Sequence, residues 1–392
     1  MRILIITPIL DPCHLWAGSH RVAYETAKLL AKRNHNVAVL TSDILSNQHK
    51  IRQSVHENDL HNCVNIIRYK TMNRRLTEMT SMTISTDYIR YLKSELHNFD
   101  IVHTHEYRTF ENIVLAHYAK KSGVPYVLQA HGSLPRIMAK QGLKWIYDVS
   151  FGQRLLRGAS KVIALSQMEA KQYKSMGVLE EKIEIIPNGI DLSEYSVLPS
   201  IGSFKKMFGM DEDEKIVLYV GRIHESKGLD LLAHAFKIIS ENIDRVKLVI
   251  VGSDDGYAAE LSGLLHSLGL EEKVILTGFV DKSVKLAAFV DGEVFVTPCF
   301  SGFPIAFLES CLAGCPIITA SGELEWINNN VGYVTEFSSG AIAKATITLL
   351  QDEQLRREFR KNSKHIIKKF DILNIIRQLE KVYGEDISSD CF

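Results

Sequence analysis

The sequence predicts an α/β protein that contains two doubly wound parallel sheets, one in each half of the chain. Three observations support this fold class. Short, continuous apolar runs recur along the chain, as is typical of buried parallel strands. Helical patterns lie between these runs, for example Val22, Thr26 and Leu29 on one face of the first helix. The series of apolar runs then restarts after a turn-rich stretch, NGIDLSEYSVLPS.

The restart divides the predicted strands into two groups. The first group is RILIIT, NVAVLT, VNIIRY, DIVHT, PYVLQA, KVIAL and KIEIIP, and the second is IVLYV, VKLVIV, KVILTG, EVFVTP and CPIITA. We therefore expect one Rossmann-like domain over residues 1–192 and another over residues 193–370, with the boundary near residues 190–200. The C-terminal segment 371–392 is helical in composition and either completes the first domain or caps the second.

Composition excludes several classes of protein. The 46 basic and 46 acidic side chains cancel, which argues against a protein that holds nucleic acid by bulk charge. No apolar run approaches the roughly 20 residues that span a bilayer. The opening RILIITPIL has no cleavage-like site, which favours a strand over a signal peptide. The six cysteines show no C-x-x-C spacing, so we expect a reduced, cytoplasmic protein.

The stretch SGFPIAFLESCLAGCP, residues 301–316, is a loop that leads directly into a predicted helix. Pro304 suits the first turn of a helix, and Gly302 leaves the loop without bulk. The backbone N–H groups near Ile305 and Ala306 then have no partner within the helix. Such a helix end attracts phosphate.

Two cations and a carboxylate accompany this helix end. Arg222 and Lys227 lie in GRIHESKG, directly after the strand IVLYV, and Glu309 lies on the predicted helix. Together these groups predict a site for a nucleotide diphosphate with its ribose. Two plainer interpretations remain open: a solvated charged loop for Arg222 and Lys227, and a surface position for Glu309.

Further candidates follow other strands, because ligands of open α/β sheets bind beyond the carboxyl ends of the strands. Gly18 permits a close backbone approach after the first strand, and His131 begins HGS after PYVLQA. The remaining candidates of this kind are Glu106, Tyr107, Gly221, Gly252, Phe279 and Val280. Two such sheets predict a ligand cleft between the domains. An ordinary turn at Gly18 and a structural role for His131 remain open alternatives.

We predict no metal site. Asp211 and Asp213 match the D-x-D pattern with which many nucleotide-sugar enzymes hold a divalent ion, but they precede a strand instead of following one. His103 and His105 alternate along a strand, which favours burial of one face over metal binding. Fixed cations and the helix end are therefore expected to neutralise the diphosphate.

The chain resembles the retaining glycosyltransferases of family 4, which have the GT-B fold and transfer hexoses from nucleotide diphosphates. The resemblance covers nearly the whole chain and rests on the joint order and spacing of six motifs. These are the glycine loop near Gly18, HGS at 131–133, ALSQMEA at 164–170, IPNGID at 186–191, GRIHESKG at 221–228 and the stretch 301–316. It implies an acceptor-side first domain and a second domain that binds the nucleotide sugar.

The resemblance also implies roles for the candidate residues. Arg222 and Lys227 bind the diphosphate, Glu309 holds the ribose hydroxyls, and His131 lies near the transferred sugar. The catalytic set is thus His131, Arg222 and Lys227. The backbone around Phe279 and Val280 meets the base, and the backbone of Phe303, Pro304 and Ile305 contacts the sugar and phosphate. The other donor-site positions are Gly18, Gly221, Gly252, Ser301 and Gly302.

One position departs from the family pattern. Ser301 stands where the family has the first of two glutamates, at a position that usually contacts the donor sugar. A covalent glutamate nucleophile is therefore excluded here, and a same-face displacement fits better, in which the departing phosphate helps to deprotonate the acceptor hydroxyl. Two other functions remain open, a sugar-nucleotide epimerase and a non-catalytic sugar-nucleotide-binding protein.

The acceptor is expected to be a saccharide or a lipid-linked saccharide, with Glu106 and Tyr107 as contacts. Segments 68–82 and 138–157 mix basic, aromatic and apolar side chains, which suits peripheral contact with an anionic membrane at its inner face. The alternative is an ordinary amphipathic helix packed on its own domain. GDP-mannose and UDP-hexoses are both expected donors, and no cofactor is expected.

Overall fold

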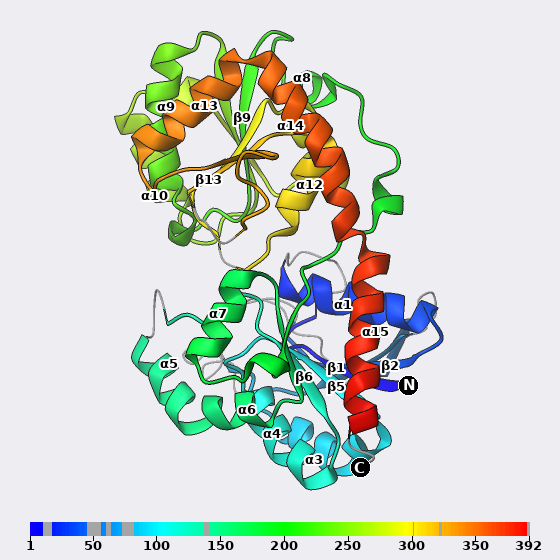
Figure 1. Ribbon diagram of the computed structural model, residues 1–392. Coiled ribbons are helices and arrows are strands. Elements are labelled where there is room, and N and C mark those ends of the chain that lie inside the picture. The colour runs from blue at the N-terminus through cyan, green and yellow to red at the C-terminus, as the bar shows by residue number, and fades with distance from the viewer. Residues whose placement is uncertain are drawn as a thin grey trace. The chain divides into compact units, whose positions relative to one another are not determined.

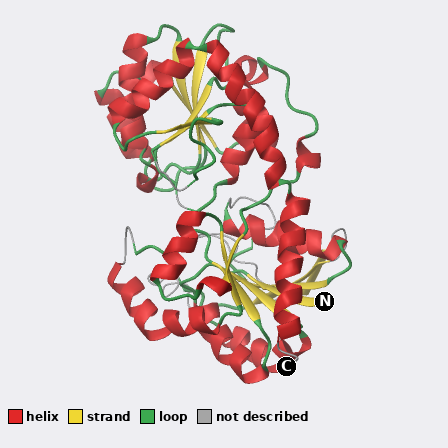
Figure 2. Cartoon of the chain, in the orientation of Figure 1, coloured by secondary structure: helices red, strands yellow, loops and turns green. Residues whose placement is uncertain are grey.

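The computed structural model describes residues 1–10, 18–44, 56–59, 64–72, 82–136, 141–300, 302–320 and 324–389. The chain divides into two compact α/β units (Figure 1). The first unit comprises Met1–Asn188 and the chain from Leu373 onward, and the second comprises Gly189–Ile372. Each unit has one sheet with helices around it (Figure 2). The predicted fold class, two Rossmann-like domains with parallel sheets, is confirmed.

The sheet of the first unit has eight strands in the order β3-β4-β2-β1-β5-β6-β7-β8. All neighbours are parallel except β3 and β4, which are antiparallel. The strands are β1 (Arg2–Ile6), β2 (Asn36–Ser42), β3 (His56–Asp59), β4 (Val64–Tyr69), β5 (Ile101–His105), β6 (Tyr126–Gln129), β7 (Lys161–Ala164) and β8 (Ile183–Ile185). The edge strand β3 was not predicted, because its sequence HEND has no apolar residue.

The helices of the first unit connect these strands. They are α1 (Ser19–Lys32), α3 (Thr86–Glu95), α4 (Phe110–Ser122), α5 (Gln141–Tyr147), a π-helical turn (Asp148–Gly152), α6 (Gln153–Gly158) and α7 (Gln167–Ser175). Three of them begin at a hydroxyl side chain that accepts a backbone N–H of the first turn: Ser85, Thr109 and Ser166. Such caps satisfy donors that the helix itself leaves unpaired.

The C-terminal helix α15 (Ile372–Ser389) packs on the first unit (Figure 1). Its Glu380 binds Arg33 at 2.7 Å and His35 at 2.9 Å, both just after α1. Its Tyr383 hydroxyl lies 2.7 Å from Nδ1 of the buried His103 on β5. A charged contact and a buried polar contact therefore attach this helix to the first sheet.

The sheet of the second unit has six parallel strands in the order β11-β10-β9-β12-β13-β14. They are β9 (Lys215–Val220), β10 (Val246–Val251), β11 (Val274–Gly278), β12 (Val294–Thr297), β13 (Ile317–Thr319) and β14 (Gly332–Val334). The helices are α8 (Ser203–Met207), α9 (Leu229–Asn242), α10 (Ala258–Ser267), α11 (Lys282–Asp291), α12 (Ile305–Ala313), α13 (Ser339–Gln351) and α14 (Glu353–Ile366). The short edge strand β14 was not predicted.

In the part of the chain that the structure describes, no helix has the length and apolar character needed to cross a membrane.

Candidate functional site

The helix α12 begins at Ile305, close to its predicted start. Pro304 precedes the helix, with φ −68° and ψ 130°, and is not its first residue. Gly302 has φ 68°, a left-handed conformation that favours glycine. Within the described residues, no side chain caps the first turn, so this end keeps the polarity that attracts an anion. Ser301 lies outside the described residues.

Phe303 is fixed by packing. Its ring is buried and lies 5.4 Å from the Phe370 ring and 6.1 Å from the Trp326 ring, between centroids. The side chain therefore belongs to the core of the second unit. Phe303 can therefore meet a ligand through its backbone and not through its ring.

The loop after β9 carries the two predicted cations. Arg222 is half-exposed and forms an ion pair with Asp255 at 2.5 Å. Burial lowers the pKa of Lys227, and the neighbouring Arg222 lowers it further. Among the described residues Lys227 has no ion pair of its own. Two adjacent cations share one carboxylate, so an anion is favoured here.

This cation loop lies against the segment that leads into α12. Gly228 ends the turn of Lys227 with φ 66°, and a Cβ built on it would lie 3.1 Å from Cβ of Pro298 and 3.7 Å from Cβ of Cys299. The nearby Cys299 thiol also acts on Lys227 and raises its pKa, against the effect of burial. The cation pair and the chain entering the helix end therefore belong to one surface of the second unit.

Glycines bring the ends of three strands together beside the cation loop. Gly252, after β10, donates its N–H to the Gly278 carbonyl at 3.0 Å, and Gly221 donates to Val251 at 2.9 Å. Directly after β11, the Phe279 side chain is 59% exposed and Val280 is partly buried. These residues have the strand-end positions that the sequence predicts for a nucleotide site.

Glu309 is almost completely buried on α12, so the alternative of a surface carboxylate is excluded. Its Oε1 accepts a hydrogen bond from Lys285 of α11 at 2.7 Å and from the Tyr195 hydroxyl at 3.1 Å. A cation and a phenol therefore fix the orientation of this carboxylate. Neither partner was predicted, although Tyr195 follows the IPNGID motif closely in the sequence.

In the first unit, the start of α1 lies beside Glu106. Gly18 precedes the helix with φ 101°, and the Ser19 hydroxyl donates a hydrogen bond to the Glu106 carboxylate. Burial raises the pKa of Glu106 to about 7, while the Ser19 hydrogen bond opposes this shift. Glu106 is thus poised between its neutral and charged forms near pH 7.

His131 has a left-handed backbone with φ 56° and is partly buried. Its Nε2 lies 2.7 Å from Nδ1 of His105, the last residue of β5. Burial lowers the pKa of His131 to about 3, so the imidazole is neutral at physiological pH. Neutral His131 can exchange hydrogen bonds with a sugar but carries no charge.

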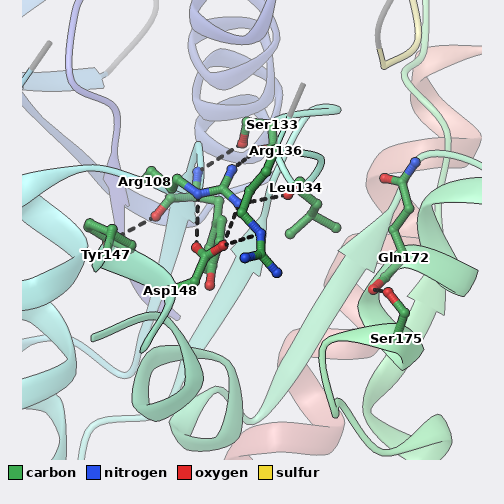
Figure 3. A network of polar contacts seen from close by, with 9 residues as sticks. Arg108, Ser133, Leu134, Arg136, Tyr147, Asp148, Gln172 and Ser175 are labelled. Atoms are coloured by element: carbon green, nitrogen blue, oxygen red, sulfur yellow. Dashed lines mark hydrogen bonds and ion pairs between the residues drawn. The ribbon is translucent and has the colours of Figure 1, made fainter. Parts of the chain in front are cut away.

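A polar network holds the HGS loop that contains His131 (Figure 3). Arg108 donates to the Ser133 and Leu134 carbonyls and binds both carboxylate oxygens of Asp148 at 2.8 Å. Glu169 of the ALSQMEA motif accepts the Gly132 N–H at 2.6 Å. This hydrogen bond therefore links the HGS loop to the ALSQMEA motif. Sequence reasoning missed this network, because its members come from separate elements.

Tyr107 follows the end of β5, as predicted, but its side chain is buried. The ring is fully buried, 5.8 Å from the Tyr147 ring between centroids, while Glu106 beside it has φ 70°. Contact with an acceptor through the Tyr107 side chain is therefore corrected to a packing role. Glu106 is the candidate that remains at this strand end.

His103 and His105 are both buried, with ring centroids 4.3 Å apart. Across the described ranges, no group of three or more histidine, cysteine or acidic side chains has an arrangement that would hold a metal ion. The ligand-binding candidates are thus two sets, one in each unit: Gly18, Glu106 and His131 in the first, and the cation loop, the α12 start and Glu309 in the second.

Two family models match the chain, one for each half. Glycosyltransferase family 4 matches residues 16–194, and glycosyl transferases group 1 matches residues 201–366.

Relatives from bacteria and archaea extend this match. An uncharacterized glycosyltransferase of Methanocaldococcus jannaschii is 29% identical over 73% of this chain and 75% of that protein. The N-acetyl-alpha-D-glucosaminyl L-malate synthase of Bacillus anthracis is 23% identical over 95% of each chain. The UDP-Gal:alpha-D-GlcNAc-diphosphoundecaprenol alpha-1,3-galactosyltransferase of Escherichia coli is 27% identical over 80% of this chain and 82% of that protein.

Solved structures share the fold. Sucrose-phosphate synthase from Thermosynechococcus elongatus has a TM-score of 0.82 at 21% identity and covers 99% of this chain and 100% of its own. HepE from Anabaena, in complex with UDP and glucose, has a TM-score of 0.77 at 20% identity, with 98% of this chain and 100% of that chain covered. With the fold, the two family models and the full-length relatives in agreement, the chain belongs to the glycosyltransferases that combine the family 4 and group 1 domains in a GT-B fold.

Proposed function

We propose that this glycosyltransferase moves a hexose from a nucleotide diphosphate to a hydroxyl acceptor, with retention of anomeric configuration and without a metal ion. The adjacent cations Arg222 and Lys227 carry this proposal. They lie against the chain that enters α12, and only Arg222 has an ion-pair partner within the described residues. Diphosphate relieves the repulsion between them and accepts hydrogen bonds from the helix end.

The reaction follows from these groups. The bond between C1 of the hexose and the β-phosphate oxygen breaks, and its electron pair goes to that oxygen. The acceptor hydroxyl oxygen bonds to C1 on the same face, and its proton passes to the departing phosphate. Arg222, Lys227 and the α12 end stabilise the charge that develops on the leaving group, as preorganised donors do.

UDP-hexoses are the donors to test first, ahead of GDP-mannose. HepE was crystallised with UDP and with UDP-glucose, and the Escherichia coli relative is named for UDP-Gal. In this proposal Glu309 binds the ribose hydroxyls, and the backbone at Phe279 and Val280 meets the base. Phe303, Pro304 and Ile305 present their backbone to the sugar and phosphate.

The proposal is tested by incubating the full-length chain with each nucleotide sugar, with and without a hydroxyl acceptor and with excess EDTA. We expect a glycoside with the donor's anomeric configuration, formed only when acceptor is present and unchanged by EDTA. A product of inverted configuration, or loss of turnover in EDTA, would contradict retention or metal independence respectively. Conversion of the donor without acceptor would indicate an epimerase, and binding without conversion would indicate a non-catalytic protein.

A lipid-linked saccharide is the proposed acceptor class, and Glu106 is the proposed contact. The Escherichia coli relative is named for a saccharide on diphosphoundecaprenol, and a Campylobacter jejuni relative for another diphospho-undecaprenol saccharide. Glu106 has a pKa of about 7 and a hydrogen bond from Ser19, so it suits a hydroxyl partner. The protein then works in the cytoplasm, at the inner face of the membrane.

One surface of the first unit supports peripheral membrane contact. Five large apolar side chains on α5 and the π-helical turn after it are 42% to 59% exposed: Leu143, Trp145, Ile146, Val149 and Phe151. Arg154 and Arg157 on α6 are exposed as well. This set is named the α5 surface. About half of each of its apolar side chains remains exposed, although Phe151 also contacts the buried Tyr147 ring. Apolar and basic groups together suit anionic lipid. Most of the other segment, 68–82, lies outside the described residues.

Trp145→Asp is expected to weaken binding to phosphatidylglycerol vesicles about tenfold, because an apolar ring that enters the interface is replaced by a charge that anionic lipid repels. Cosedimentation with vesicles of phosphatidylglycerol and phosphatidylcholine measures the affinity. Phe337→Asp is the matched control, since Phe337 is an aromatic residue of the second unit that is at least as exposed as Trp145 (63% against 54%). Equal binding by both variants and the unmodified protein, or no vesicle binding at all, would contradict the α5 surface as a membrane contact.

A further inference from the structure

The hydrogen bond between His105 and His131 has a consequence for the chemistry of His131. The two rings meet edge to edge: their planes are 18° apart, their centroids are 5.0 Å apart, and His105 Nδ1 lies 2.7 Å from His131 Nε2. His105 is fully buried on β5, whereas His131 is partly exposed. Burial lowers the pKa of both imidazoles, and the neighbouring histidines lower that of His105 further. Both rings are therefore neutral at physiological pH.

A neutral imidazole has one protonated and one bare ring nitrogen, so one of these histidines donates and the other accepts. The second ring nitrogen of His105, Nε2, is buried and has no hydrogen-bond partner within the described residues. If His105 accepted at Nδ1, its proton would occupy Nε2 and leave a buried N–H without an acceptor. Orphaned buried N–H groups are rarer and less favourable than a bare acceptor. The proton of His105 is therefore on Nδ1, which donates to His131.

The backbone around His131 supports a fixed orientation of this ring. Its φ of 56° is uncommon for a residue with a side chain. Glu169 holds the next N–H, from Gly132, at 2.6 Å, and the Ser133 hydroxyl donates to the Ala130 carbonyl at 2.6 Å. A strained residue that its surroundings hold from both sides is typical of a functional site.

We propose that His105 is a positioning residue that holds His131 as the tautomer protonated on Nδ1. His131 then offers the transferred sugar a hydrogen-bond donor, and its Nε2 lone pair is occupied, so it does not serve as a proton acceptor. This inference rests on the proposed function only for the ligand, the sugar; the tautomer is a property of the protein without substrate. It separates His131 from Glu106, whose pKa burial raises to about 7.

The tautomer is measured by two-bond ¹H–¹⁵N correlation spectra of the full-length chain labelled with ¹⁵N in the histidine rings. His131→Gln identifies the His131 signals by their loss. We expect a protonated Nδ1 and a bare Nε2 for His131 in the unmodified protein. In His105→Leu we expect the tautomers of His131 to mix. His103→Leu is the matched control: it removes an equally buried histidine of β5 whose ring lies 4.3 Å from that of His105 but which bonds to Tyr383 and not to His131, so the tautomer of His131 should not change.

Kinetics provide the second measurement. His105→Leu is expected to lower kcat about tenfold with little change in the KM of the donor, and to have no further effect in a His131→Ala background. A proton on Nε2 of His131 in the unmodified protein would overturn the inference even if transfer is normal. Additive effects of the two substitutions would also overturn it. Failure of the proposed function appears differently, as no transfer from any donor while the spectra still show the Nδ1 proton.

Discussion

Lys227→Ala is expected to lower kcat/KM for sugar transfer by about 10²–10³-fold, the loss typical for removal of one preorganised donor from a developing oxyanion. Lys227 is partly buried, and the described residues give it no ion pair. Its positive charge is therefore not committed to the fold. In the proposed reaction this charge stabilises the leaving diphosphate, so the loss is expected mainly in kcat.

The direction of the pKa shift of Lys227 predicts a second measurable effect of Lys227→Ala. Burial and Arg222 lower the pKa of Lys227, so both disfavour its charged form. A bound diphosphate opposes this shift, and the protein should therefore take up protons when UDP binds at alkaline pH. Isothermal titration calorimetry in buffers of different ionisation enthalpy measures this uptake. It should fall in Lys227→Ala.

Lys237→Ala is the matched control for Lys227→Ala. Lys237 lies on α9 of the same unit and forms an i,i+4 ion pair with Glu241 at 3.3 Å, where both side chains are exposed. Removal of this cation changes the net charge equally, but its effect on stability is small, since exposed pairs contribute about 0–1 kcal/mol. Transfer at a normal rate by Lys227→Ala, or an equal loss in both variants, would reject the role assigned to Lys227.

The strands that were predicted from the sequence are those in which a continuous apolar run forms a strand that is buried in the sheet. Apolar runs such as RILIIT give strands that are buried on both faces, so the pattern is unambiguous even in a single sequence. The strand HEND has no such pattern, because β3 pairs only at an edge of the sheet. The pairing of β3 with β4 depends on the rest of the folded sheet, and the residues of β3 alone do not predict it.

The site divides in the same way. Arg222 and Lys227 lie five positions apart in one loop, so their proximity was readable from the sequence. Glu309 meets Lys285 from 24 residues away and Tyr195 from 114 residues away, and no local pattern encodes such contacts. Tyr107 shows the converse error. A position at the end of a strand does not determine whether a side chain faces solvent or the core, and the left-handed backbone of Glu106 separates these two neighbours.

Gly252→Ala is expected to reduce the free energy of unfolding by about 1–3 kcal/mol, the range for a side chain forced against neighbouring atoms at a strained backbone. Gly252 has φ 152°, and a Cβ built on it would lie 1.9 Å from the Gly221 carbonyl oxygen. The obstacle is backbone and not a flexible side chain, so the chain itself has to move. Denaturant unfolding followed by circular dichroism measures the loss.

The same substitution should weaken UDP binding, because the atom that clashes belongs to the loop that carries Arg222. Gly221 joins the ends of β9 and β10 by donating its N–H to the carbonyl of Val251, the neighbour of Gly252, at 2.9 Å, and a shift there displaces the cation pair. Gly263→Ala is the control: a Cβ at this exposed position of α10 meets no atom within 4 Å, and alanine in place of glycine favours a helix by about 0.5–1 kcal/mol. A Gly252→Ala protein of unchanged stability would contradict the close approach of the two loops. A destabilised protein with unchanged UDP affinity would instead separate that approach from the donor site.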